Sequence, residues 1–378
     1  MDIDTFLSAN KSMVIAPAGF GKTYTIAECI ASYRGEKRVL VLTHTHAGIA
    51  SLKEKFRLKN IPSSTYQLET ICGFALNLVK AYHLNKDEIP SLSDAGSLFH
   101  FAIEHATKIL KALPIKKYLA IKYDHLIVDE YQDCTVGQHQ MIMSLSTILH
   151  THILGDPLQG IFDFGREHIV DFSEESFKLF NDNCQSLEIP WRWNNAGRIA
   201  LGQDLLSIRS KLLSTNTLDL HNYHEIKVVI APENDYAISR SLYKNEIYNA
   251  LRDNSVLLIH PTSESVEPRK KFIQQFPQLK VYRKDFLHDI CNALRDADRL
   301  GVSAAESIER NRNILRRKGR KIQGKVIGTT LLTKGLEFDT VVVLNAHRFN
   351  DKRHLYVALT RCCKQLIVIS NNHILNPN

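Results

Sequence analysis

The chain has 378 residues, of which 44% are hydrophobic, so it can bury more than one small core and two domains are expected. Its formal net charge of +8 is compatible with a polyanionic partner, although many basic proteins bind no nucleic acid. The seven cysteines form no C-x-x-C pair, which favours reduced thiols over a zinc site. No apolar run approaches about 18 residues, and the amino-terminal segment lacks a secretory pattern, so we expect a cytoplasmic protein.

The first half of the chain alternates between two kinds of segment. Short apolar runs rich in β-branched residues occupy 13–16, 38–43, 125–130 and 151–156. Longer stretches between them, including 45–58 and 66–82, have helical spacing. This alternation is typical of a parallel α/β sheet. We therefore expect a first domain over residues 1–188, with a helical insert at about 75–120.

The second half repeats the alternation. Its apolar runs occupy 227–231, 255–260, 325–330, 340–346 and 365–370. These runs predict a second α/β lobe over residues 189–378, interrupted by a charged helical insert at about 284–320. The predicted fold class is α/β, with two parallel-sheet lobes and short helical insertions.

A phosphate-binding loop is expected at residues 16–23, APAGFGKT, between an apolar strand and a helical stretch. Its glycines let backbone N–H groups face phosphate oxygens at a helix N-terminus. The residues assigned to bind nucleotide here are Ala18, Gly19, Gly21, Lys22 and Thr23. Lys22 would contact the β and γ phosphates and Thr23 would ligate Mg²⁺. The alternative is an ordinary glycine turn with an incidental lysine.

An acidic pair follows the third apolar run, in LIVDEYQD. In an open parallel sheet this end of a strand faces the ligand crevice. We assign Asp129 to the Mg²⁺ site and Glu130 to the attacking water, the two carboxylate roles that an NTPase needs. In isolation, exposed acidic residues at a strand end are equally well explained as a solvated surface.

Several further segments resemble motifs of superfamily 1A helicases of the UvrD/Rep/PcrA type, and they occur in that family's order. Besides the phosphate loop and DEYQ with Asp133, these are GDPLQGIFDF (155–164), IPWRW (189–193), TTLLTKGLEFDTVVV (329–343) and LYVALTR (355–361). The resemblance implies two RecA-like lobes that bind ATP and Mg²⁺ and move along a single nucleic-acid strand. A kinase or GTPase would not explain the other motifs.

Carried onto this sequence, the resemblance implies further nucleotide contacts. Gln159 would sense the γ-phosphate, while Arg192 and Arg361 would approach it from the second lobe and stabilise charge in the transition state. Glu337 would bind near the sugar and triphosphate. The alternative for an isolated arginine such as Arg361 is a surface ion pair.

The same resemblance predicts how the base is held. Tyr24 and Trp191 occupy the positions that hold adenine, and an aromatic sandwich is our inference. Simple core packing is the alternative for Trp191. The family usually has a glutamine upstream of the phosphate loop that reads the adenine edge, but no glutamine precedes Lys22 here. Selectivity for ATP over other nucleotides is therefore expected to be weaker.

Contacts to the strand are also implied by the resemblance. The candidates are His44, Thr45, Thr70, Phe74, Phe162 and Phe164. Aromatic faces can stack on bases, although a lone phenylalanine is ordinarily a core residue. A metal site at His44 and His46 lacks a nearby third ligand. The basic run at 316–321 is either a phosphate-binding edge or a solvated charge run.

Two departures bear on function. Leu331 stands where the family has a histidine that touches the strand or couples it to hydrolysis, and both gaps that carry accessory domains in relatives are short. The leading hypothesis is an ATP-dependent translocase or helicase on single-stranded DNA, favoured over RNA and moving 3′ to 5′ by resemblance alone. The alternative is an NTP-sensing regulatory subunit of a nucleic-acid processing or anti-phage complex, beside a partner such as a nuclease and without unwinding of its own.

Overall fold

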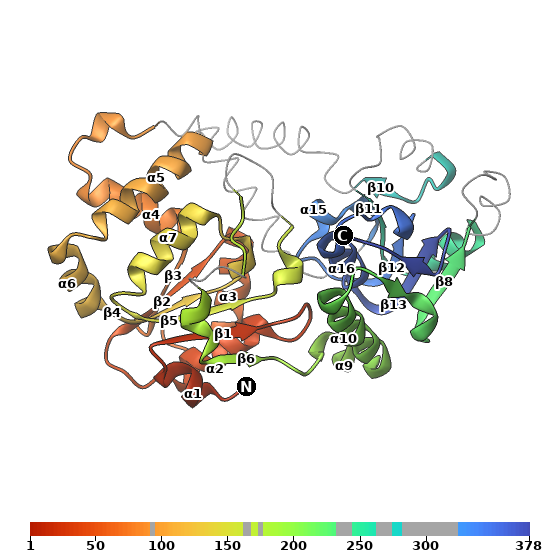
Figure 1. Cartoon of the computed structure of the whole chain (residues 1–378), viewed down its shortest axis with the longest axis horizontal. Coiled ribbons are helices and arrows are strands. Elements are labelled where there is room, and N and C mark those ends of the chain that lie inside the picture. Colours follow the sequence, from red (N-terminus) through yellow and green to blue (C-terminus); the bar gives the residue numbers. More distant parts are fainter. Residues whose placement is uncertain (91–94, 162–167, 173–176, 232–243, 262–273, 282–323) are drawn as a thin grey trace, which may run out of the picture. The chain divides into compact units, whose positions relative to one another are not determined.

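The chain divides into two compact units, Met1–Glu188 (unit 1) and Ile189–Asn378 (unit 2), each taken by itself below (Figure 1). The computed structural model describes residues 1–90, 95–161, 168–172, 177–231, 244–261, 274–281 and 324–378. The expected insert at about 284–320 and the basic run at 316–321 lie outside these residues.

Unit 1 is built on a six-stranded parallel sheet with the order β3-β2-β4-β5-β1-β6. The strands are β1 (Lys11–Ile15), β2 (Arg38–Thr43), β3 (Tyr66–Thr70), β4 (Tyr123–Val128), β5 (His150–Gly155) and β6 (Cys184–Ser186). The central strands are buried along most of their length because both faces of the sheet are covered, which is why they appear in the sequence as continuous apolar runs.

Helices connect these strands. They are α1 (Ile3–Ser8), α2 (Lys22–Ser32), α3 (His46–Leu58), α4 (Ile71–Tyr82), α5 (Ala95–Ile109), α6 (Leu113–Lys122), α7 (Val136–Leu145) and α8 (Lys178–Asn181), with 3-10 turns η1 (Lys86–Glu88), η2 (Tyr131–Asp133) and η3 (Pro157–Gln159). Helices α4, α5 and α7 bury apolar residues in one cluster with side chains of β2, β4 and β5. Most of the described residues between 75 and 120 are helical.

One predicted element is wrong in part. The helical stretch expected over 66–82 is strand β3 followed by helix α4. Among the described strands, Tyr66–Thr70 pairs only with β2, so β3 is an edge strand there and lacks the continuous apolar run of a central one. The helix begins after Thr70, whose side chain accepts a hydrogen bond of 3.0 Å from the backbone N–H of Gly73.

Unit 2 contains a second parallel sheet, with the order β10-β11-β9-β12-β13-β8. Its strands are β8 (Ile226–Ile230), β9 (Ser255–His260), β10 (Lys280–Val281), β11 (Gly324–Thr329), β12 (Phe338–Val343) and β13 (Cys362–Ser370). Its helices include α9 (Trp191–Asn195), α10 (Ile199–Ser214), α15 (Thr330–Thr333) and α16 (Lys352–Leu359), with turns η5 (Leu220–Asn222) and η6 (Ala346–Arg348). A short antiparallel pair joins β7 (Leu218–Asp219) and β14 (Ile374–Leu375).

The two parallel sheets with connecting helices confirm the predicted α/β fold class. Each sheet has its own cluster of buried apolar side chains. Six cysteines are free thiols, and Cys291 lies outside the residues that the structure describes. Among the described helices, none is both long enough and apolar enough to cross a membrane.

Candidate active site

The loop that joins β1 to α2 turns tightly at two glycines. Gly19 and Gly21 have φ angles of 80° and 86°, a left-handed conformation that side-chain-bearing residues rarely adopt. Gly21 caps α2, so the first N–H groups of the helix follow the loop directly. Ala18 and Thr23 are buried on either side of this turn. The backbone therefore has the form of an anion-binding helix N-terminus.

Lys22, the first residue of α2, is held by two carboxylates. Its Nζ lies 3.2 Å from Asp129 Oδ1 and forms a second ion pair with Glu130 Oε2. Burial alone would lower the pKa of Lys22, but the charges of Asp129 and Glu130 outweigh burial and raise the pKa above its ordinary value. Lys22 is therefore a cation at neutral pH, and it neutralises one of the two negative charges of the acidic pair.

The acidic pair follows β4 in an unusual backbone conformation. Asp129 is fully buried and its backbone N–H donates to Leu42 O at 2.8 Å, which ties the end of β4 to β2. Glu130 has φ 56° and ψ 42°, in the left-handed region, and its N–H donates to Asp129 Oδ1 at 2.9 Å. A strained residue of this kind persists only where its surroundings fix it, and such residues cluster at functional sites.

Two residues that the sequence analysis did not assign join this cluster. Gln132 donates from Nε2 to Glu130 Oε2 at 2.6 Å, and its Oε1 accepts from the backbone N–H of Asp156 at 3.1 Å. The Asp156 carboxylate in turn accepts from Gln159 Nε2 at 3.1 Å. Gln132 and Asp156 stand inside the motifs DEYQ and GDPLQ, so their positions were visible in the sequence, but not their bridging contacts.

The cluster therefore draws on three neighbouring strands. The phosphate loop follows β1, the acidic pair follows β4, and Asp156 with Gln159 follows β5; these strands are adjacent in the order β4-β5-β1. Because the strands are parallel, all three loops lie at the same edge of the sheet. The sequence assignments Lys22, Asp129, Glu130 and Gln159 are brought together by this arrangement.

The two aromatic residues assigned to the base lie in different units. Tyr24 is in the first turn of α2 and is 51% exposed. Trp191 begins α9 and is 48% exposed, so it is not the buried core residue that was its alternative reading. Each ring thus has surface available for stacking.

The two arginines assigned to the γ-phosphate are bound inside unit 2. Arg192 donates to Glu337 Oε1 at 2.9 Å and to the carbonyl of Thr360. Arg361 is 1% exposed and donates from Nε to Val357 O at 2.9 Å and from Nη2 to Thr360 Oγ1 at 3.1 Å. Arg361 is therefore not the surface ion pair of its alternative reading, because its guanidinium is surrounded by backbone and hydroxyl oxygens.

The residues assigned to the strand differ in their placement. Thr45 is exposed and caps α3 by accepting from Gly48 N–H at 3.0 Å, as Thr70 caps α4. The Nε2 of His44 lies 3.4 Å from Cys134 Sγ. Phe74 is a correction: it is 4% exposed within the core cluster of unit 1, a position for packing and not for base stacking. Phe162 and Phe164 lie outside the described residues.

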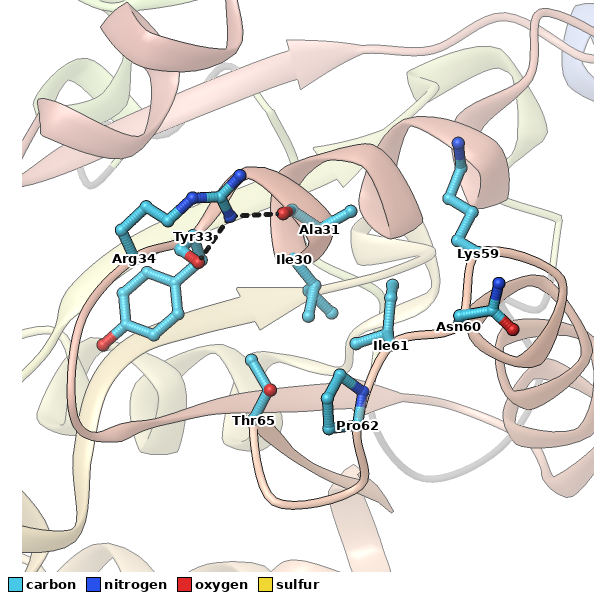
Figure 2. A pocket seen from close by; sticks show the side chains of 9 residues that line it. All are labelled: Ile30, Ala31, Tyr33, Arg34, Lys59, Asn60, Ile61, Pro62 and Thr65. Carbon is cyan, nitrogen blue, oxygen red and sulfur yellow. Dashed lines mark hydrogen bonds between the residues drawn. The ribbon is translucent and has the colours of Figure 1, made fainter.

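A pocket of about 180 Å³ lies elsewhere in unit 1, near the carboxyl ends of α2 and α3 (Figure 2). It is lined by Ile30, Ala31, Tyr33, Arg34, Lys59, Asn60, Ile61, Pro62 and Thr65. Arg34 points back to the end of α2 and donates to Ala31 O at 2.6 Å. The lining contains none of the residues assigned to nucleotide, so this pocket is separate from the phosphate loop.

Comparisons with known proteins agree with these motifs over the first unit. Residues 2–165 match the model of an AAA domain. The chain is 24% identical over 190 residues to a protein of Streptococcus sanguinis described as a subunit of an ATP-dependent helicase/nuclease, covering 46% of this chain and 15% of that protein. A protein of the same description from Streptococcus suis is 27% identical over 143 residues, covering 34% and 11% respectively.

Over part of its length the chain is thus similar to an AAA domain and to subunits of ATP-dependent helicase/nucleases. It spans less than a sixth of the length of these curated relatives. Among solved structures, it is similar to an arterivirus nonstructural protein 10 helicase, with 13% identity, a TM-score of 0.43, and coverage of 97% of this chain and 61% of that one. The same helicase in complex with DNA gives 12% identity, a TM-score of 0.44, and coverage of 97% and 62%.

Unit 1 offers oxygen donors suited to magnesium. Thr23 and Asp129 supply one hydroxyl and one carboxylate, and both are buried beside the phosphate loop. Mg²⁺ commonly binds to one or two protein oxygens together with phosphates of the substrate. Within the described residues no group of three or more His, Cys, Asp or Glu side chains could hold a metal by itself. The donor set fits an ion that arrives with its nucleotide.

Proposed function

We propose that the protein hydrolyses ATP at the phosphate loop of unit 1 and couples hydrolysis to movement along single-stranded DNA. The observation that carries the proposal is the Lys22 cluster, in which one lysine at a helix N-terminus is paired with both Asp129 and Glu130. A cation, two carboxylates and the amide Gln159, gathered at the carboxyl edge of a parallel sheet, are the groups that phosphoryl transfer to water requires.

The pairing suggests how binding prepares the site. When a triphosphate enters the loop, Lys22 exchanges its carboxylate partners for phosphate oxygens. Glu130 then loses the cation that neutralised it and becomes available to accept a proton from the attacking water. Gln132 holds the Glu130 carboxylate through its 2.6 Å hydrogen bond during this exchange. Magnesium bound with the nucleotide would neutralise charge on the β and γ phosphates.

A first experiment tests the ATPase. Replacement of Lys22 by Ala removes the cation at the loop, so the steady-state rate of ATP hydrolysis should fall to background with or without single-stranded DNA. The matched control is Lys37→Ala, which removes an exposed lysine that precedes β2 and should leave turnover unchanged. Retained strand-stimulated hydrolysis in Lys22→Ala would remove the assignment.

The strand, the direction and the partner are further parts of the proposal. Thr45 and Thr70 remain our candidates for phosphate contacts because both stand at helix N-termini. Arg192, Arg361, Glu337 and Trp191 are proposed to complete the nucleotide site from unit 2. Movement from 3′ to 5′ rests on resemblance, and the comparison of 3′-tailed with 5′-tailed duplexes in an unwinding assay tests it.

A second candidate function is an NTP-dependent regulatory component of a larger complex. It is favoured by the description of the relatives as helicase/nuclease subunits. Hydrolysis assays with and without single-stranded DNA or RNA separate the two candidates. A motor is stimulated severalfold by its strand, whereas a regulatory switch binds and hydrolyses nucleotide at a rate that the strand does not change.

A further inference from the structure

One face of the Tyr24 ring is covered by a lysine from another helix. The Nζ of Lys59 lies 4.2 Å from the centroid of the Tyr24 ring, within the range of a cation–π contact. Tyr24 nevertheless remains 51% exposed. The ring therefore has one face fixed by the protein and much of its remaining surface open to a ligand.

The position of Lys59 is set by the way α3 ends. Lys59 is the last residue before a left-handed turn, since Asn60 has φ 54°. The N–H of Asn60 donates to Arg57 O at 3.1 Å and the N–H of Ile61 donates to Phe56 O at 3.0 Å, which together form a Schellman motif. The Lys59 side chain then points away from Ile61 and Pro62 (Figure 2). It approaches α2, against which α3 packs.

Glu28 completes the arrangement from the next turn of α2. It stands four residues after Tyr24, so both side chains lie on the same face of the helix. The hydrogen bond from Lys59 lowers the pKa of Glu28, and the same bond raises the pKa of Lys59. Glu28 therefore holds the cation that covers the ring.

We propose that Lys59 and Glu28 are positioning residues, which hold the Tyr24 ring so that its open face stacks on the base of the bound nucleotide. The inference rests on the proposed function, because it takes Tyr24 as a base contact at the loop of Lys22. An unsupported tyrosine would lose rotamer freedom when the base binds, whereas a ring already clamped on one face loses less. Lys59 and Glu28, which together form this clamp on Tyr24, therefore affect binding of the base and not of the phosphates.

Calorimetric measurements of ATP binding and of inorganic tripolyphosphate binding separate the contribution of the base from that of the phosphates. Tripolyphosphate occupies the phosphate loop but has no base. Lys59→Met should weaken ATP binding by about two- to fivefold, the range of an exposed cation–π contact, and leave tripolyphosphate binding unchanged. Lys59→Arg keeps a cation that stacks on aromatic faces and should restore ATP binding. In steady-state assays Lys59→Met should raise KM and leave kcat within about twofold.

Two controls accompany this measurement. Lys37→Met removes the same charge from an exposed site away from Tyr24 and should change neither affinity. The double variant Tyr24→Ala/Lys59→Met should bind ATP no more weakly than Tyr24→Ala, because Lys59 acts through the ring. Equal weakening of ATP and tripolyphosphate by Lys59→Met, or additive losses in the double variant, would overturn the inference.

Failure of the proposed function itself gives a different result. In that case wild-type protein binds neither ATP nor tripolyphosphate, or Lys22→Ala binds tripolyphosphate as well as the wild type does. Thermal unfolding of each variant accompanies the titrations. Because Lys59→Arg retains the ion pair with Glu28, it reports on the clamp even if Lys59→Met unfolds.

Discussion

At the scale of single residues, Glu130 has a strained backbone and is also the proposed base. Its left-handed backbone costs on the order of 1 kcal/mol for a residue other than glycine. The cost is offset by the ion pair with Lys22 and the hydrogen bond from Gln132, both of which need the carboxylate where this backbone places it. The conformation therefore aims the side chain at the phosphate loop at some expense in stability.

Replacement of Glu130 by Gln tests its role as the base. Glutamine keeps the size of the side chain and can still accept the hydrogen bond from Gln132, but it cannot take a proton from water. We expect kcat for ATP hydrolysis to fall by about 100-fold or more, while nucleotide affinity changes by less than about threefold. A Glu130→Gln variant that turns over at the wild-type rate would assign the base elsewhere.

At the scale of elements, α3 is fitted closely to the strand before it. A Cβ atom added at Gly48 would lie 2.5 Å from Thr43 Oγ1, closer than real side chains approach one another. Thr43 ends β2 and is buried, so its hydroxyl has little room to move. The glycine in THTHAGIA thus allows the first turn of α3 to approach the sheet.

The variant Gly48→Ala should accordingly lower the free energy of unfolding by about 1–3 kcal/mol through overpacking, despite the higher helix propensity of alanine. Thr43→Ala removes the two atoms that clash most closely, and the remaining contact with Thr43 Cβ, 3.4 Å, is ordinary. The double variant should therefore be more stable than Gly48→Ala alone. Urea denaturation followed by circular dichroism measures both, and equal stability of the single and double variants would refute this account of the packing.

Whether a strand could be predicted from the sequence depends on how many of its faces are buried. Central strands such as β2 and β4 are covered on both faces, so continuous apolar runs marked them correctly. The edge strand β3 lies in a stretch whose spacing predicts a helix, and the three-residue strand β6 is too short to leave a pattern in the sequence. Motif order predicted Lys22, Asp129, Glu130 and Gln159, but the link from Gln132 to Asp156 joins positions 24 residues apart and depends on the tertiary fold.

At the scale of the whole molecule, each unit has its own core, and unit 1 also contains a buried chain of histidines. His152 Nδ1 lies 2.7 Å from Ser12 Oγ, and its Nε2 lies 2.8 Å from His125 Nδ1. These contacts join β1, β5 and β4 near their amino ends. Burial lowers the pKa of His152 well below its usual value and also lowers that of His125. Both rings are neutral in the folded protein at pH 7.

Acid should therefore destabilise unit 1. Unfolded histidine takes up a proton near pH 6.5, whereas these folded rings do not, so their contribution to stability is complete above about pH 6.5 and is lost as the pH falls below it. For each of these neutral rings, the free energy of unfolding falls by up to about 1.4 kcal/mol per pH unit in that range. Urea denaturation followed by far-UV circular dichroism at pH 7.5 and pH 5 measures the slope.

His152→Gln supplies the control, because glutamine can donate and accept hydrogen bonds without titrating in this range. Its unfolding free energy should depend less steeply on pH, whatever its absolute value. Both tryptophans, Trp191 and Trp193, belong to unit 2, so their fluorescence follows that unit separately in the same experiment. An unchanged pH dependence in His152→Gln would place the acid sensitivity elsewhere.

The order of strands in unit 1 also creates a division that protein engineers can use. The residues proposed to act on the triphosphate follow β4, β5 and β1. The turns after β2 and β3 begin α3 and α4 with threonine caps and lie outside the Lys22 cluster. New sequences grafted into those two turns would leave the hydrolytic groups in place. Recognition of the nucleic-acid strand could thus be redesigned at the turns after β2 and β3 without changing the hydrolytic site.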